Sequence, residues 1–144
     1  MLRIELDRYE WRDIEKTIDK LVQEISNLRI RAIHGLPRGG VIVAALLCYR
    51  TGLPLDDGDL YDEIVCDWVF PKEQRGEVLI VDDVCDTGKT LQFFYEAGFT
   101  TAALFARSTT LYTPDFHVHW IIHDKYLLMP WETSIGTGVK TSGS

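Results

Sequence analysis

The run Val78-Leu79-Ile80-Val81 constrains the fold of this chain more than any other segment. Four consecutive apolar residues, mostly β-branched, are typical of a strand that is buried on both faces, as in a parallel sheet covered by helices. Two acids, Asp82 and Asp83, follow directly at the carboxyl end of the expected strand. Because ligands of open α/β sheets bind beyond this end of the strands, we place a candidate ligand site there.

Strands and helices are expected to alternate along the rest of the chain. Apolar residues at three- and four-residue spacing predict an amphipathic helix over 9–28, and Asp7 and Glu10 have the spacing of a capping box at its start. Further helices are expected over 41–51 and 87–97, and strands over 30–34, 53–55, 64–70, 78–81, 101–106 and 118–122. This alternation predicts an α/β fold with a parallel sheet and right-handed crossovers.

Length and charge limit the class of protein further. The 144 residues suit one domain, which we expect over 1–135, followed by a flexible tail over 136–144. A net charge of −7 disfavours a nucleic-acid-binding surface. The longest apolar run, 41–48, is too short to span a membrane. Three cysteines without a CxxC spacing argue against disulfides and a zinc site, so we expect a cytoplasmic protein.

The segment Asp86-Thr87-Gly88-Lys89-Thr90 is expected to start a helix after the buried strand. Backbone N–H groups at a helix start can bind a phosphate. A Walker A loop is excluded because position 83 is Asp where that motif needs Gly, and the glycines at 35, 39 and 40 lack the Rossmann spacing. The alternative interpretation is an ordinary turn in which Asp86 or Thr87 only caps the helix.

Two carboxylates beside a phosphate-binding loop suit a phosphorylated sugar. The carboxylates can accept hydrogen bonds from vicinal hydroxyls while the loop binds the phosphate. The pattern therefore indicates a sugar 5-phosphate as the ligand class. A receiver-like domain that is phosphorylated on Asp82 or Asp83 is another reading, but it leaves the glycine-rich segment around Arg38 unexplained.

Three segments resemble the type I phosphoribosyltransferases. Residues 78–91 resemble the family's binding motif for phosphoribosyl pyrophosphate (PRPP), and residues 34–40 are similar to its pyrophosphate loop. Residues 124–132 resemble the base-covering segment of xanthine-guanine phosphoribosyltransferases. The resemblance spans about residues 9–132 and implies a parallel sheet flanked by helices, with a small C-terminal hood at about 124–135.

The resemblance implies a role for each matching residue. Asp82 and Asp83 would bind the ribose hydroxyls directly or through Mg²⁺, and Asp86 would act as general base. The residues expected to bind PRPP are Asp82, Asp83, Asp86, Thr87, Gly88, Lys89 and Thr90. Those expected to bind pyrophosphate are Pro37, Arg38 and Gly39, with a cis peptide bond before or after Pro37. Those expected to bind the base are Arg107, Tyr126, Leu127 and Glu132.

The implied activity is transfer of the 5-phosphoribosyl group from PRPP to a 6-oxopurine (guanine, xanthine or hypoxanthine), with release of pyrophosphate. The resemblance also implies a homo-oligomer, either a dimer or a tetramer. One departure is a short lid, since only residues 57–77 occupy the interval where the family has a long loop. These residues also keep Tyr61 without the family's preceding Ser. This departure favours an alternative, a PRPP-binding sensor with little transferase activity. Separately, His117, His119 and His123 alternate and could share a metal, although exposed strand positions explain them as well.

Overall fold

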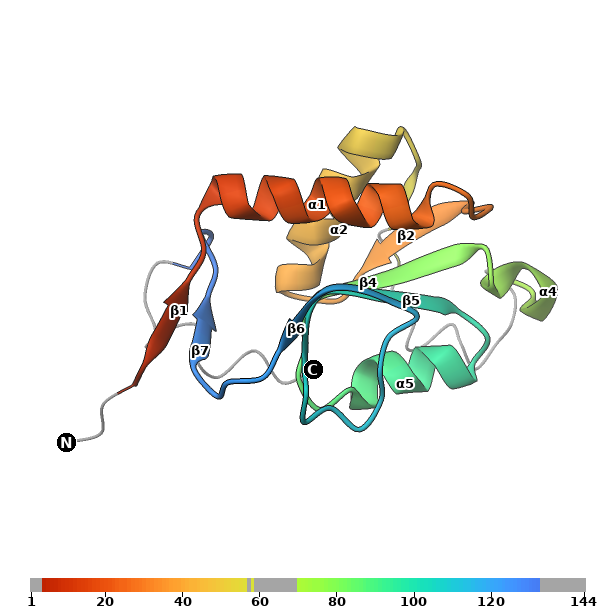
Figure 1. The fold of residues 1–144 in the computed structure, drawn as a ribbon. Coiled ribbons are helices and arrows are strands. Elements are labelled where there is room, and N and C mark those ends of the chain that lie inside the picture. Colours follow the sequence, from red (N-terminus) through yellow and green to blue (C-terminus); the bar gives the residue numbers. More distant parts are fainter. Residues whose placement is uncertain (1–3, 57, 59–69, 133–144) are drawn as a thin grey trace.

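The computed structural model describes residues 4–56, 58 and 70–132, which form a five-stranded parallel sheet and a second, two-stranded one (Figure 1). The five-stranded sheet has the order β3-β2-β4-β5-β6, so the buried run predicted from the sequence lies at its centre. The strands are β2 (Ala32–Gly35), β3 (Leu55–Asp56), β4 (Val78–Cys85), β5 (Thr100–Arg107) and β6 (Phe116–Ile121). All four pairings between neighbouring strands are parallel, which confirms the predicted α/β class.

Helices cover both faces of this sheet. Helices α1 (Trp11–Ile25) and α2 (Gly39–Thr51) lie on one face, and α5 (Lys89–Glu96) lies on the other (Figure 1). A short helix, α4 (Lys72–Arg75), precedes β4. Leu79 and Val81 pack with the helices of the first face, whereas Val78 and Ile80 pack with α5. The central strand therefore contributes side chains to both halves of the core, as its continuous apolar run predicts.

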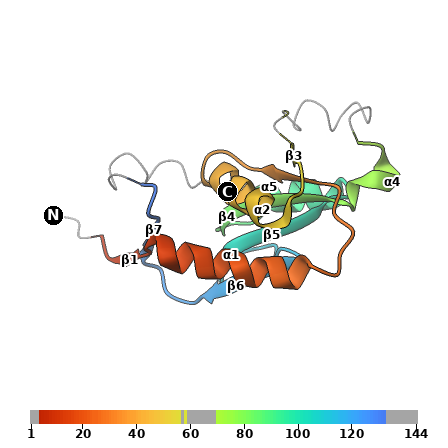
Figure 2. The ribbon, with the colours of Figure 1, turned by 90° about the horizontal axis from the view of Figure 1, so that it is seen from above.

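The second sheet joins the two ends of the described chain. Strand β1 (Leu6–Arg8) pairs in parallel with β7 (Tyr126–Leu128), beside one end of the main sheet (Figure 2). Two flanking hydrogen bonds extend the pairing, from Tyr126 N to Glu5 O and from Tyr9 N to Leu128 O, each 3.0 Å long. We call β1, β7 and residues 122–132 the hood. The hood expected from residues 124–135 alone thus contains an N-terminal strand as well.

Several predicted boundaries were wrong. The capping box of α1 is formed by Glu10 and Asp13, because Asp7 lies in β1. Helix α2 begins at Gly39 where 41–51 was expected, and α5 spans Lys89–Glu96 where 87–97 was expected. Strand β4 continues past Val81 to Cys85, since Asp82, Val84 and Cys85 also pair with β5.

The predicted strand over 64–70, the lid with Tyr61, and the tail over 136–144 lie largely or wholly outside the described residues. Within the described residues, no helix combines the length and the apolar character needed to cross a bilayer.

Candidate functional site

The two acids of β4 lie against the first turn of α2. A Cβ atom added to Gly39 would lie 2.0 Å from Oδ2 of Asp83, and one added to Gly40 would lie 3.4 Å from Oδ1 of Asp82. Asp82 is buried, and its Oδ1 accepts a hydrogen bond from the backbone N–H of Asp83 at 2.9 Å. Asp83 is half-buried, and its Oδ1 accepts from Val84 N at 2.9 Å. Glycine at 39 and 40 thus permits a close approach between the carboxylates and the loop before α2.

This loop matches the segment predicted to bind pyrophosphate. Its backbone is fixed at one end by a 2.9 Å hydrogen bond from Leu36 N to Val81 O on the central strand. The peptide bond between Pro37 and Arg38 is cis, one of the two positions expected. Arg38 is exposed and immediately precedes α2, so its guanidinium is available at the helix start. The loop and the carboxylates of β4 therefore lie at the same edge of the sheet.

A second loop, residues 86–88, connects β4 to the start of α5. Gly88 has a φ of 85°, and a Cβ there would lie 2.6 Å from Thr110 Oγ1, so both backbone conformation and space favour glycine. Leu111 N donates a 3.0 Å hydrogen bond to Thr87 O, which ties the loop to the segment after β5. Lys89 is exposed, and Thr90 is half-buried. The first turn of α5 follows directly, and its N–H groups point to the helix start, as the predicted phosphate-binding role requires; that of Lys89 donates to Thr87 Oγ1 at 3.4 Å.

The hood lies next to the carboxylates. One small cavity, of about 30 Å³, is lined by residues from β4, β5 and the hood. The lining residues are Asp83, Val84, Asp86, Arg107, Tyr126, Leu127 and Glu132. The structure therefore brings all four residues predicted to bind the base to two of the acids predicted to bind PRPP, Asp83 and Asp86. Val84 also lines the cavity, although it was not among the predicted site residues. The periodicity of the strand next to the acids could have indicated it.

The hydroxyl of Tyr126 donates a 2.5 Å hydrogen bond to Oε2 of Glu132 across this cavity. Burial raises the pKa of Tyr126 well above its usual value, and Glu132 raises it further by accepting this bond and through its charge. The charge of Asp83 also raises the pKa of Tyr126, whereas the charge of Arg38 lowers it. Tyr126 is therefore the neutral donor at neutral pH, within electrostatic reach of both predicted phosphate and ribose sites.

The guanidinium of Arg107 contacts the main chain of the hood. Its Nη1 donates to His123 O at 3.0 Å and its Nη2 to Lys125 O at 2.7 Å. Its Nε lies 3.9 Å from Oδ1 of Asp86. Arg107 thus links the strand end, the hood and the loop before α5.

The three histidines after β5 have separate partners. His119 Nε2 lies 3.0 Å from Thr17 Oγ1, and His123 Nε2 lies 2.8 Å from Asp7 Oδ2. His117 contacts the ring of Trp120. Among the residues that the structure describes, no three His, Cys, Asp or Glu side chains are grouped as ligands for a metal ion.

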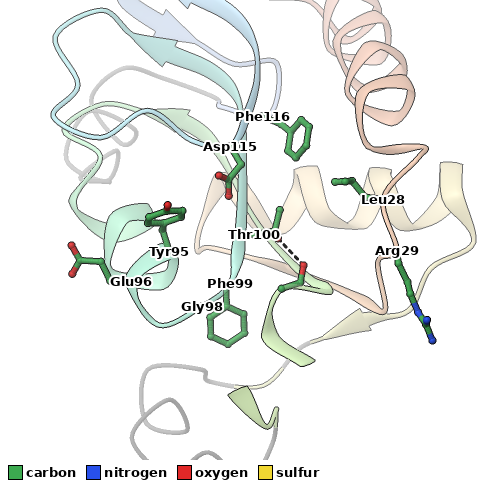
Figure 3. Close-up of a pocket in the computed structure, with 10 residues that line it drawn as sticks. Leu28, Arg29, Tyr95, Glu96, Gly98, Phe99, Thr100, Asp115 and Phe116 are labelled. Atoms are coloured by element: carbon green, nitrogen blue, oxygen red, sulfur yellow. Dashed lines mark hydrogen bonds between the residues drawn. The ribbon is translucent and has the colours of Figure 1, made fainter. Parts of the chain in front are cut away.

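A wider depression, of about 750 Å³, lies at the opposite end of the sheet (Figure 3). Tyr95 and Glu96 of α5 line one side of it, and Leu28 and Arg29 line the other (Figure 3). Thr100, at the start of β5, donates a 2.7 Å hydrogen bond to Gly76 O within it. None of the predicted site residues lines this depression, which lies at the amino ends of the strands.

Comparison with solved structures identifies similar proteins over nearly the whole chain. A purine phosphoribosyltransferase from Pyrococcus horikoshii is 27% identical with a TM-score of 0.70, and the match covers 90% of this chain and 95% of that one. A xanthine-guanine-hypoxanthine phosphoribosyltransferase from Helicobacter pylori has 16% identity and a TM-score of 0.70, with 94% and 99% covered. A hypothetical protein from Neisseria gonorrhoeae with bound ppGpp has 19% identity and a TM-score of 0.68, with 97% of each chain covered. Neither a family model nor a curated protein matches the sequence.

The strand order, the flanking helices and the loops at the carboxyl edge define the type I phosphoribosyltransferase fold. The chain therefore has the fold of this enzyme family, a resemblance that its sequence motifs predicted. Two of the solved structures that it resembles are phosphoribosyltransferases named for purine substrates.

Proposed function

We propose that this protein transfers the 5-phosphoribosyl group of PRPP to a purine base and releases pyrophosphate. The observation that supports this proposal most is the contact of the Asp83 carboxylate with Gly39, which joins the ribose and pyrophosphate segments at one edge of the sheet. The resemblance of residues 124–132 to the xanthine-guanine enzymes supports a 6-oxopurine as the base. Guanine, hypoxanthine and xanthine are the substrates to test first.

The proposed reaction forms one bond and breaks one. A ring nitrogen of the base attacks the anomeric carbon of PRPP, and the bond from that carbon to the pyrophosphate oxygen breaks with its electron pair on pyrophosphate. Arg38 and the Gly39 amide stabilise the developing negative charge, because a guanidinium can bind two phosphate oxygens at once. Asp86 accepts the proton that the base nitrogen loses, since its half-exposed carboxylate lines the cavity that Tyr126 borders.

The carboxylates of β4 fit Mg²⁺ as a partner of PRPP. Mg²⁺ prefers oxygen ligands and is commonly bound by one or two carboxylates together with substrate phosphates. Asp83 provides an oxygen that faces Gly39 and the pyrophosphate loop, and Asp82 lies next to Gly40. When bound, the metal neutralises negative charge on the pyrophosphate leaving group. Asp82 and Asp83 are the residues that we propose to hold it, directly or through water.

The base requires an outward movement of the hood. A cavity of about 30 Å³ holds about one water molecule, far less than a purine ring. Tyr126 and Glu132 both line the cavity, so breaking the hydrogen bond between them would allow it to widen. We propose that Tyr126 then covers one face of the base, while Leu127 and Glu132 contact its edge.

The direct test is to incubate the purified protein with PRPP, Mg²⁺ and one base at a time. The bases are guanine, hypoxanthine, xanthine and adenine, and the products to quantify are the nucleotide and pyrophosphate. Formation of equal amounts of both products with a 6-oxopurine supports the proposal. Product with adenine alone would overturn the 6-oxopurine assignment, and no product with any base would overturn the transferase.

A PRPP-binding sensor is the second candidate function. The closed hood favours it, since Tyr126 and Glu132 are hydrogen-bonded to each other at a cavity that is too small for a base. The Neisseria gonorrhoeae protein with bound ppGpp is a further reason to test nucleotide ligands without transfer. Calorimetric titration distinguishes the two candidates, because a sensor would bind PRPP with Mg²⁺ tightly and form no nucleotide. Light scattering of the same preparation tests the expected homo-oligomer.

A further inference from the structure

Arg107 ends the strand next to the central one, and its side chain is only 15% exposed. The resemblance predicts that this residue donates to the exocyclic oxygen of the base. In the structure, its two terminal nitrogens donate to the carbonyls of His123 and Lys125, which flank Asp124. Hydrogen bonds from a charged donor are stronger than those between neutral groups. The guanidinium therefore holds one short turn of main chain in a defined position.

This turn leads directly into β7. Lys125 precedes Tyr126, the first residue of the strand, and Tyr126 and Leu127 both line the cavity next to the acids. A displacement of the turn would be transmitted to both residues, because there is no intervening segment to absorb it. The position of the turn thus sets the position of the side chains proposed to contact the base.

A second contact fixes the same turn from the N-terminal side of the hood. His123 Nε2 lies 2.8 Å from Oδ2 of Asp7 in β1, and that oxygen also accepts a 2.8 Å hydrogen bond from the Tyr9 hydroxyl. The other ring nitrogen, Nδ1, accepts from Lys125 N at 3.1 Å. Arg107 contacts this turn through its carbonyls, whereas Asp7 contacts it through a side chain. The two contacts therefore fix the same turn from two sides.

We infer that Arg107 is a positioning residue, which acts on the base through the hood and not by direct contact. This inference rests on the proposed function, since it concerns the same base site. The inference predicts that Arg and Lys at position 107 are not equivalent. The planar guanidinium reaches two carbonyls at once, whereas a single ammonium group is a point charge that lacks this geometry. A direct contact to one base oxygen would need only one donor.

The experiment compares Arg107→Lys and Arg107→Ala with the wild type in two measurements. The first is the affinity for inosine 5′-monophosphate and for purine riboside 5′-monophosphate, which lacks the 6-oxygen. The second is amide hydrogen exchange over residues 126–128, measured without ligand. Arg31→Lys is the matched control, because Arg31 pairs with Glu77 at 2.9 Å on an exposed surface away from the hood.

For Arg107→Lys we expect both nucleotides to bind about tenfold more weakly, which corresponds to about 1.4 kcal/mol. The ratio of the two affinities and the affinity for PRPP should stay within about twofold of the wild type, and exchange over 126–128 should be about tenfold faster. Arg107→Ala should show the same pattern with larger losses. If Arg107→Ala does not fold, the Lys variant still provides both measurements. The Arg31→Lys control should match the wild type throughout.

A selective loss of affinity for inosine monophosphate, with unchanged exchange over 126–128, would overturn the inference and assign Arg107 to the base oxygen. Equal affinity of all variants, with unchanged exchange, would overturn it too. If the wild type binds neither nucleotide nor PRPP, the proposed function fails. The exchange rates then still decide whether Arg107 fixes the hood, so the two failures are distinguishable.

Discussion

Gly39→Ala is the sharpest test of the contact between α2 and the carboxylates. The new Cβ would lie 2.0 Å from Oδ2 and 2.4 Å from Cγ of Asp83, so the carboxylate must rotate away. Gly39 begins α2 and does not have a left-handed backbone, and alanine favours a helix over glycine by about 0.5–1 kcal/mol. The substitution should therefore displace the Asp83 carboxylate with little change in stability.

The expected effect on ligand binding follows from the loss of the proposed hydrogen bond between the Asp83 carboxylate and a ribose hydroxyl of PRPP. A hydrogen bond to a charged group contributes about 1.5–3 kcal/mol, so PRPP with Mg²⁺ should bind about ten- to hundredfold more weakly. Calorimetric titration measures this affinity, and thermal unfolding measures stability. Gly76→Ala is the matched control, because its Cβ would lie 3.9 Å from the nearest atom, Gly98 O. Wild-type affinity in Gly39→Ala would refute the reasoning, and a large drop in melting temperature would show that α2 itself had moved.

Three further predictions concern the acids, the phosphate loop and alkaline stability. Replacing both Asp82 and Asp83 with Asn should abolish PRPP binding in calorimetry. The fold should persist, since the amide oxygens can still accept the 2.9 Å hydrogen bonds from the backbone. Unchanged affinity for PRPP would contradict the ribose role. Gly88→Ala should destabilise the protein by about 1–3 kcal/mol in denaturant unfolding, because its φ is 85° and its Cβ would lie 2.6 Å from Thr110 Oγ1; wild-type stability would show that the loop adapts freely. Burial raises the pKa of Tyr112 to about 12, so the stability it contributes is present below its ordinary pKa of 10 and is lost as pH rises through about 12. Denaturant unfolding between pH 9 and 12 should therefore show a decline that is smaller in Tyr112→Phe, and identical declines would argue against this origin.

The central features of the fold were predictable because they depend on local sequence. The apolar run over 78–81 predicted a buried central strand, and the spacing of Ile14, Ile18 and Leu21 predicted the buried face of α1. The extension of β4 through its acids was missed, since composition marks an acid as a strand end. Pairing of Asp82 with Ala103 and of Val84 with Phe105 keeps these residues in the sheet. Tertiary pairing thus outweighs the local preference at the site itself.

The glycines near residue 39 show a different limit of sequence reasoning. The helix was expected to start after them, at residue 41, yet Gly39 and Gly40 form the first turn of α2. The reason is close packing, since a Cβ on Gly40 would lie 2.6 Å from Val81 O and one on Gly35 would lie 2.3 Å from Gly40 O. Small size, more than flexibility, is what these positions require. Sequence alone does not distinguish the two needs.

The two halves of the candidate site differ in how strongly the sequence specifies them. The PRPP half consists of contiguous segments, where glycines and acids leave a recognisable pattern. The base half depends on main-chain carbonyls that accept from Arg107 and on the pairing of β7 with β1, and neither leaves a pattern in residue types. A substitution at Asp7, far from the base segment in sequence, is therefore expected to change base binding through His123 while PRPP binding persists. We therefore expect the affinity for the base to depend on how the hood is held, with determinants that extend to the N-terminal strand.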